Sequence, residues 1–291
     1  MKTTEPFVRS TEDVGNIIHL EHVNLLIPEQ RLATIFYILG LGLTRDPYLV
    51  TGVVNMWVNV GQSQFHLPLG DAQRFRGHIG VVMPDRASLV DRLAGVQESL
   101  SGTQFAWSEH LEYVEATCPW GNVFRCYESD SSRFGGLHLG IPYVELSVPV
   151  GSAEPIVDFY REIFDAPGSV DAASADGTIA GRTSVGAAQE LIFRETSAPI
   201  PAYDGHHIQI YVHNFSGPHE RLVERGLITE ESSQHQFRFA SILNLSTGKE
   251  CFALEHEVRS MRHPLYARPL VNRNPSQTNV NYVRGRDAMT P

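Results

Sequence analysis

A fourfold repeat constrains the fold of this chain more than any other feature of its sequence. Short segments that alternate apolar with more polar residues begin at His22, His78, Tyr143 and His207, 56, 65 and 64 residues apart. This period of two predicts half-buried strands whose first residue lies on the face opposite the apolar set. Repeats of this length are supersecondary units that bury their apolar faces against one another.

A helix-like segment follows each of these strands, and further strand-and-turn segments follow each helix. Helical spacing predicts helices over residues 28–39, 86–100, 152–164 and 217–225, with Asp85 and Ser152 at the start of the second and third. The repeating module is therefore β-α-β-β-β. Modules 1 and 3 share a Phe-Tyr pair in the helix, and modules 2 and 4 share His-Ile at the strand start, so the chain reads as a duplicated pair of modules.

The length of 291 residues agrees with about two domains. A Ser- and Gly-rich segment around residues 131–140 marks the expected boundary. We expect modules 1 and 2 to form an N-terminal domain over 17–131 and modules 3 and 4 a C-terminal domain over 139–260. The tail over 261–291 has no helical or strand period and should be irregular.

Composition excludes several classes of protein. The net charge of −10 argues against non-specific nucleic-acid binding, which needs a cationic surface. The cysteines Cys118, Cys126 and Cys251 are widely spaced and predict neither a disulfide framework nor a Cys-rich zinc site. Neither a secretory signal nor a run of about 20 apolar residues is found, so a cytoplasmic location without membrane contact is expected. P-loop, GxGxxG, HExxH and GxSxG motifs are also absent.

Six segments give the chain a resemblance to a known superfamily; they are LEHVNL (20–25), FYILGLG (36–42), GHIGVV (77–82), CPWGNVF (118–124), VDFYRE (157–162) and GHHIQI (205–210). The sequence resembles the vicinal oxygen chelate superfamily, which contains glyoxalase I, bleomycin-resistance proteins and extradiol dioxygenases. The resemblance implies an α+β fold of four βαβββ modules, paired into two open, cup-shaped mixed β-sheet barrels with flanking helices. It also implies a divalent metal inside a cup, bound by first-strand and last-strand residues.

In the N-terminal half, the resemblance implies metal ligands at His22, His66 and His78. If Phe65 and Leu67 pack on the helices, alternation points Gln64 and His66 into the cup. Arg125 stands where the family has a glutamate and cannot ligate a cation. Three imidazoles with open positions suit Fe(II), Zn, Ni, Mn or Cu. The expected substrate-binding residues are Arg125, Tyr127, Gln64 and Tyr211.

In the C-terminal half, Tyr143 replaces the first histidine and His207 occupies the second position. The last strand places Glu255 in the cup, so we expect His207, Tyr143 and Glu255 to be catalytic, as a weaker metal site or as a metal-free base and hydrogen-bond donor. The alternative for His22 and His78 is a solvated sheet face, and for Glu255 a charge-rich edge strand whose salt bridges contribute little.

The expected function is that of a metal-dependent enzyme acting on a small, oxygen-chelating and partly aromatic substrate. Lyase, isomerase and ring-cleaving dioxygenase chemistry all remain open at this point. The alternative is a non-catalytic protein of the same fold that binds or sequesters a small molecule, as bleomycin-resistance proteins do. The expected partner is a small-molecule substrate, and homo-oligomer formation is left open.

Overall fold

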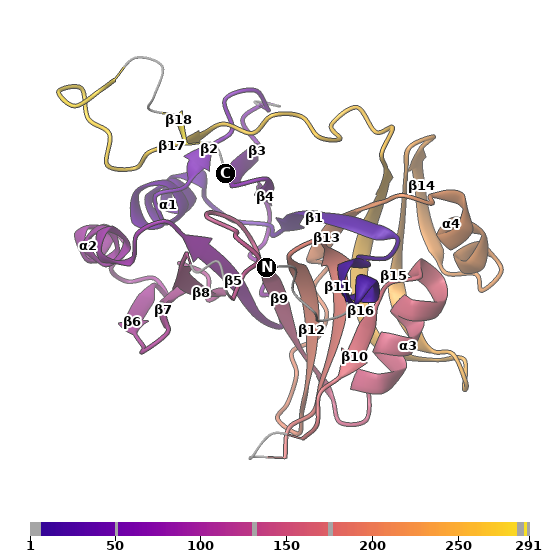
Figure 1. Cartoon of the computed structure of the whole chain (residues 1–291). Helices are drawn as coiled ribbons and strands as arrows, with labels where there is room; N and C mark the ends of the chain where they lie inside the picture. The colour runs from indigo at the N-terminus through magenta and orange to yellow at the C-terminus, as the bar shows by residue number, and fades with distance from the viewer. Residues whose placement is uncertain (1–6, 50–51, 130–132, 174–176, 284–287, 290–291) are drawn as a thin grey trace.

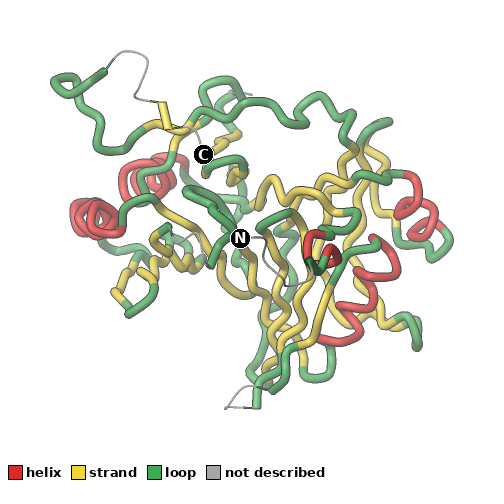
Figure 2. The backbone as a smooth tube through the Cα atoms, viewed as in Figure 1, coloured by secondary structure: helices red, strands yellow, loops and turns green. Residues whose placement is uncertain are grey.

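The computed structural model describes residues 7–49, 52–129, 133–173, 177–283 and 288–289. Most of its strands form two eight-stranded mixed sheets, with helices α1 and α2 at one side of the molecule and α3 and α4 at the other (Figures 1 and 2). Neither sheet closes on itself, because each has two different strands at its edges. The predicted α+β class with open, cup-shaped sheets is confirmed.

The first sheet combines modules 1 and 4 in the order β14-β15-β16-β13-β1-β4-β3-β2. Its strands are β1 (Ile17–Asn24), β2 (Thr44–Arg45), β3 (Asn55–Val60), β4 (Ser63–Pro68), β13 (His207–Val212), β14 (Ile228–Ser233), β15 (Gln236–Asn244) and β16 (Lys249–Ser260).

The second sheet combines modules 2 and 3 in the order β10-β11-β12-β9-β5-β8-β7-β6. Its strands are β5 (Gly77–Met83), β6 (Ala106–Glu109), β7 (Tyr113–Thr117), β8 (Val123–Glu128), β9 (Tyr143–Pro149), β10 (Gly168–Val170), β11 (Ala180–Gly186) and β12 (Gln189–Thr196).

This pairing differs from the expected one, in which modules 1 and 2 shared a sheet and modules 3 and 4 shared another. Strand β1 instead pairs antiparallel with β13, and β5 pairs antiparallel with β9. Each module offers the same free edge, that of its first strand, so the repeat alone does not determine which two modules join. The two halves of the chain are therefore not separate sheets, and each sheet contains strands from both.

The helices, unlike the sheets, pack within the two halves. The helices are η1 (Arg9–Glu12), α1 (Gln30–Ala33) continued by a π-helix η2 (Thr34–Gly40), α2 (Arg86–Val96), α3 (Ala153–Phe164) and α4 (Ser216–Val223). Helix α2 contacts η2, and α3 contacts α4. The side chain of Asp85 accepts hydrogen bonds from the backbone of Ala87 and Ser88, which confirms the predicted start of α2.

The first helix is a π-helix over most of its length, not the regular helix expected over 28–39. Its consecutive residues Phe36 and Tyr37 both face the core, where both are fully buried. Their rings contact aromatic residues of both sheets: Tyr37 lies 5.4 Å from Phe65 of β4, and Phe36 lies 5.5 Å from Phe124 of β8. The apolar faces of the two sheets thus meet at the helices, and the opposite, polar faces form two cups.

The segment after β16 crosses the first sheet as an extended chain, shown in yellow at the top of Figure 1. It is irregular as expected, apart from β17 (Asn272–Arg273) paired with β18 (Ala288–Met289). Residues 284–287 and 290–291 of the expected tail lie outside the described residues. Asn272 accepts from the Gly61 backbone nitrogen at 3.0 Å and donates to the Gly61 oxygen at 2.8 Å, which ties the segment to module 1.

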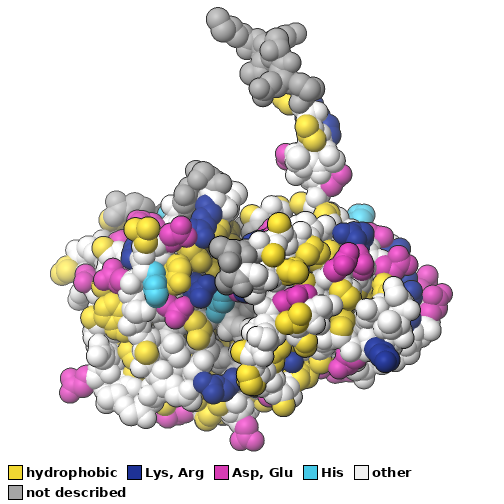
Figure 3. Space-filling model, turned by 90° about the horizontal axis from the view of Figure 1, so that it is seen from below, with side chains coloured by type: hydrophobic (Ala, Val, Ile, Leu, Met, Phe, Trp, Pro, Cys, Tyr) yellow, Lys and Arg dark blue, Asp and Glu magenta, His cyan; other side chains and the backbone are white. Residues whose placement is uncertain are grey.

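The outer surface carries mixed charge. On the face seen in Figure 3, Lys and Arg side chains are interspersed with Asp and Glu. Among the described residues, no helix combines the length and the apolar character needed to span a lipid bilayer.

Candidate metal centre

The strand register defines four equivalent positions in each cup. Each module contributes two of these positions. One is the first residue of the repeat. The other lies on the last strand of the module and pairs with the residue two places after that first residue: Asn24 pairs with His66, Gly80 with Arg125, Glu145 with Ile192, and Gln209 with Glu257. The first cup, formed by the first sheet, therefore carries His22, His66, His207 and Glu257. The second cup carries His78, Arg125, Tyr143 and Ile192.

Three of the first-cup residues converge as a metal-binding group. One ligand atom each from His22, His207 and Glu257 lies within 4.8 Å of the others, and all three residues are buried. His66 stands beside them, with its ring centroid 5.7 Å from that of His22. It stacks on Trp57 at 3.8 Å, and its Nε2 lies 3.3 Å from the Asn55 side-chain oxygen.

The imidazoles of this group have buried nitrogens that the protein leaves unpaired. Within the described part of the chain, Nε2 of His22 and Nε2 of His207 have no hydrogen-bond partner. A buried polar atom without a partner costs about 1–3 kcal/mol, so such atoms point to a bound group that satisfies them. Burial lowers the pKa of His22 to about 3 and that of His207 to about 2. Both rings are therefore neutral near pH 7, as metal binding requires.

Two carboxylates orient these histidines from behind. Glu21 Oε2 lies 2.6 Å from Nδ1 of His22, and Glu255 Oε1 lies 3.4 Å from Nδ1 of His207. A carboxylate at Nδ1 places the ring proton there and leaves the lone pair of Nε2 directed at the centre, the usual arrangement of metal-binding histidines. A bulge of β1 between Leu20 and His22 brings Glu21 to the cup side.

Two arginines give the centre a positive side. Arg259 Nη2 lies 2.5 Å from Glu257 Oε1, and Arg238 bonds both Glu257 and Glu255. Arg259 also lies 3.7 Å from Glu21. Together with a divalent cation, the two arginines would outweigh the three carboxylates by one charge. The donor set therefore fits a metal ion accompanied by an anionic ligand.

A cavity of about 510 Å³ lies between β1, β13 and the C-terminal segment, on the side of Glu21. Its lining includes Glu21, Tyr211, Tyr266 and Arg268. Burial raises the pKa of Tyr211 to about 12, so its hydroxyl is a neutral hydrogen-bond donor. Gln64 is buried beneath this cavity, where its amide bonds Asp46, Asn59 and Arg268.

The predicted residues are thus distributed over both cups. His22 and His66 share the first cup, as expected, together with His207, Gln64 and Tyr211, but His78 lies in the second sheet and does not join them. Arg125, Tyr127 and Tyr143 accompany His78 in the second cup. Glu255 lies behind His207, and Glu257, which the sequence reasoning missed, faces the centre. The alternation of the strand could have indicated Glu257, because it lies two residues after Glu255 and therefore on the same face.

Comparisons of sequence alone identify no relatives: no family model matches the chain, and neither does any curated protein. Solved structures do match. Glyoxalase I from Zea mays aligns with a TM-score of 0.58 at 10% identity, over 83% of this chain and 92% of that one. A protein titled "putative dioxygenase" from Bacillus subtilis aligns with a TM-score of 0.55 at 13% identity, over 86% and 87%. The chain therefore shares its fold with glyoxalase I from Zea mays and with that Bacillus subtilis protein.

Proposed function

We propose that this protein is a metal-dependent enzyme that acts on a small anionic substrate with adjacent oxygen atoms. The metal would be held by His22, His207 and Glu257, with His66 beside them. The observation that carries the proposal is the pair of buried, unpartnered Nε2 atoms that face a buried carboxylate.

The donor set favours one branch of the expected chemistry. Two histidines and one carboxylate with open positions are typical of non-haem iron(II) oxygenases, so we propose iron(II) and a ring-cleaving dioxygenase activity ahead of a lyase or isomerase. The metal would act as a Lewis acid toward the substrate oxygens.

The protein residues would bind and orient the substrate. Arg238 and Arg259 would attract its negative charge, and the hydroxyl of Tyr211 would donate a hydrogen bond from the cavity wall. The C-terminal segment at Tyr266 and Arg268 would exclude water from the same cavity.

Metal content tests this proposal directly. The protein is stripped with a chelator, reconstituted without oxygen with Fe(II), Zn, Ni or Mn, and measured by elemental analysis. Trp57 gives a second readout, because its ring stacks on His66 and its fluorescence should be quenched by a bound paramagnetic ion. We expect one ion per chain in the wild type and loss of that ion in His22→Ala and in His207→Ala.

His78→Ala is the matched control, because His78 occupies the equivalent position in the second cup. Its metal content should equal that of the wild type. A wild type that retains no metal would overturn the proposal in favour of a non-catalytic binding protein. Oxygen consumption with catechol would support the dioxygenase branch, whereas a metal-loaded protein inert to catechols would leave lyase or isomerase chemistry as the better proposal.

A further inference from the structure

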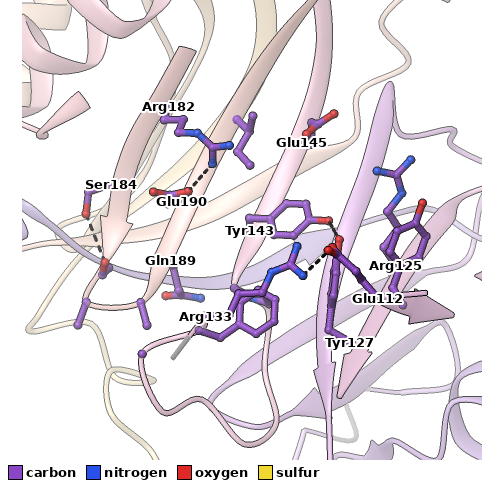
Figure 4. Close-up of a pocket in the computed structure, with 18 of the residues that line it drawn as sticks. Glu112, Arg125, Tyr127, Arg133, Tyr143, Glu145, Arg182, Ser184, Gln189 and Glu190 are labelled. Atoms are coloured by element: carbon purple, nitrogen blue, oxygen red, sulfur yellow. Dashed lines mark hydrogen bonds and ion pairs between the residues drawn. The ribbon is translucent and has the colours of Figure 1, made fainter. Parts of the chain in front are cut away.

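The second cup encloses a cavity of about 670 Å³ that the proposed enzyme activity does not use (Figure 4). This volume is in the range of about 300–1,000 Å³ that small-molecule sites occupy. Its lining combines aromatic side chains with arginines and glutamates, and the aromatic side chains are those of Tyr113, Tyr127, Phe134 and Tyr143.

The second cup does not carry a metal-binding group like that of the first. Of its four equivalent positions His78 is the one that offers a suitable ligand atom for a transition metal, since Arg125 is a cation, Ile192 is apolar and burial raises the pKa of the Tyr143 hydroxyl, which keeps it protonated. Among the described residues, three His, Cys, Asp or Glu ligand atoms converge only in the first cup. The hollow therefore suits an organic ligand.

A chain of hydrogen bonds connects the polar groups on the floor of this cavity. The hydroxyls of Tyr127 and Tyr143 lie 2.8 Å apart, and the Tyr143 hydroxyl lies 3.1 Å from Nε2 of His78. Burial raises the pKa of both phenols and lowers that of His78 to about 4, so the chain is uncharged near pH 7. Gly80 makes room for it, because a Cβ there would lie 2.4 Å from the ring of Tyr143.

The cation best placed for a ligand is Arg125 at the wall of the cavity. Its Nε donates to Glu115 at 3.1 Å, and its guanidinium lies 5.0 Å from the ring centroid of Tyr113. The two terminal nitrogens of Arg125 make no hydrogen bond to any described residue. A guanidinium with both terminal nitrogens available can bind a carboxylate through two parallel bonds.

Arg133 extends the same wall. It pairs with Glu112 at 2.9 Å and lies over the rings of Tyr127 and Phe134, at 4.6 Å and 5.2 Å. The other arginines of the cup are bound more completely, since Arg194 uses two nitrogens on Glu145 and Arg182 bridges Asp171 and Glu190. A ring placed against Tyr113, Tyr127 and Phe134 would therefore have its acidic group beside Arg125.

We propose that the second cup is a binding site for a small aromatic carboxylic acid, separate from the metal centre. The carboxylate is bound by Arg125, and the ring packs against the tyrosines above the Tyr127–Tyr143–His78 chain. Binding involves no metal and no chemical step.

The test uses the full-length protein after chelator treatment, so that metal binding plays no part. Calorimetry measures the binding of benzoate, 4-hydroxybenzoate, salicylate and phenylacetate, with cyclohexanecarboxylate as the non-aromatic control and benzamide as the uncharged one. We expect at least one aromatic acid to bind more tightly than both controls. Arg125→Gln should weaken that binding at least 10-fold.

Glu115→Gln is the matched variant, since it removes the same half-exposed ion pair but keeps the guanidinium. It should bind the aromatic acid as well as the wild type or better, and His22→Ala should leave the affinity unchanged. The proposal is overturned if none of the four acids binds with a Kd below 10 mM, which corresponds to a binding free energy of about −2.7 kcal/mol. It is also overturned if Arg125→Gln binds normally, or if His22→Ala abolishes binding.

Discussion

The two cups are built from the same module and differ in three of four equivalent side chains and in what covers them. The first cup carries His22, His66, His207 and Glu257 at its equivalent positions, and the C-terminal segment lies beside it. The second carries His78 with Arg125, Tyr143 and Ile192 at those positions, over a polar cavity of about 670 Å³. One backbone arrangement thus supports a buried group of candidate metal ligands in one place and an uncharged hydrogen-bonded floor in the other.

Glu257→Gln should have the largest effect of the variants considered, because it should weaken metal binding in the first cup. It removes the only carboxylate among the three converging ligands, so the affinity for Fe(II) or Co(II) should fall by more than about 100-fold, since even residues behind a ligand affect affinity by 10- to 100-fold. Titration followed by Trp57 fluorescence measures it. Ile192→Gln, at the equivalent position of the second cup, is the control and should leave metal affinity unchanged. Equal affinities for Glu257→Gln and the wild type would place the metal elsewhere.

Arg268→Ala should destabilise the C-terminal segment beside the first cup and should not affect the second cup. Arg268 donates to the fully buried carboxylate of Asp46 at 2.7 Å. Removing the cation leaves that carboxylate with only its amide partners, and we expect the free energy of unfolding to fall by about 2–3 kcal/mol. Urea unfolding measures the loss, and the rate at which a chelator removes the metal should rise. Arg262→Ala, an exposed change on the same segment, should cost under about 0.5 kcal/mol, and a similar loss there would contradict the assignment.

His78→Gln should flatten the pH dependence of stability. Burial lowers the pKa of His78 to about 4, whereas an unfolded histidine has a pKa near 6.5. The unfolded chain therefore takes up the proton first as the pH falls from 6.5 to 4, and the wild type loses up to about 2–3 kcal/mol across that window. Glutamine does not titrate, so the variant should lose correspondingly less when unfolding is measured at pH 7 and pH 4.5. Identical losses would show that His78 is not held neutral in the second cup.

Gly80→Ala should have the smallest effect, confined to the second cup. The added methyl group would lie 2.4 Å from the ring of Tyr143, so the ring must shift, at a cost of about 1–2 kcal/mol in unfolding free energy. Gly95→Ala in α2 meets no atom within 4 Å and should stabilise the protein by about 0.5–1 kcal/mol. Metal affinity should be unchanged in both variants. A Gly80→Ala protein as stable as Gly95→Ala would show that the Tyr143 ring is not fixed there.

The module and its polar face could be predicted from the sequence because alternation is a local property. The residues Phe65 and Leu67 pack in the core, and Gln64 and His66 lie on the cup side, as alternation requires. The first residues of the four repeats also lie in the cups. Local pattern was therefore sufficient to predict which residues lie on the cup side, but not to choose Glu257 over Glu255 in module 4.

The partner of each module could not be predicted, because pairing depends on contacts between strands far apart in the chain. His22 was assigned with His78, whereas β1 pairs with β13 and brings it to His207. The choice between Glu255 and Glu257 depends on strand register inside module 4. Both point into the cup, and only the parallel register of β16 on β13 sets Glu255 beside His207 and Glu257 beside Gln209.

The pairing of the outermost modules has a consequence for how the protein becomes functional during synthesis. Modules 2 and 3 are neighbours in sequence and can join while the chain is still being made, whereas β1 must wait for β13. Joining strands so distant in the chain is entropically costly and slow. The candidate metal ligands are thus among the last residues to come together, and no fragment that lacks either end of the 17–260 region can bring them together.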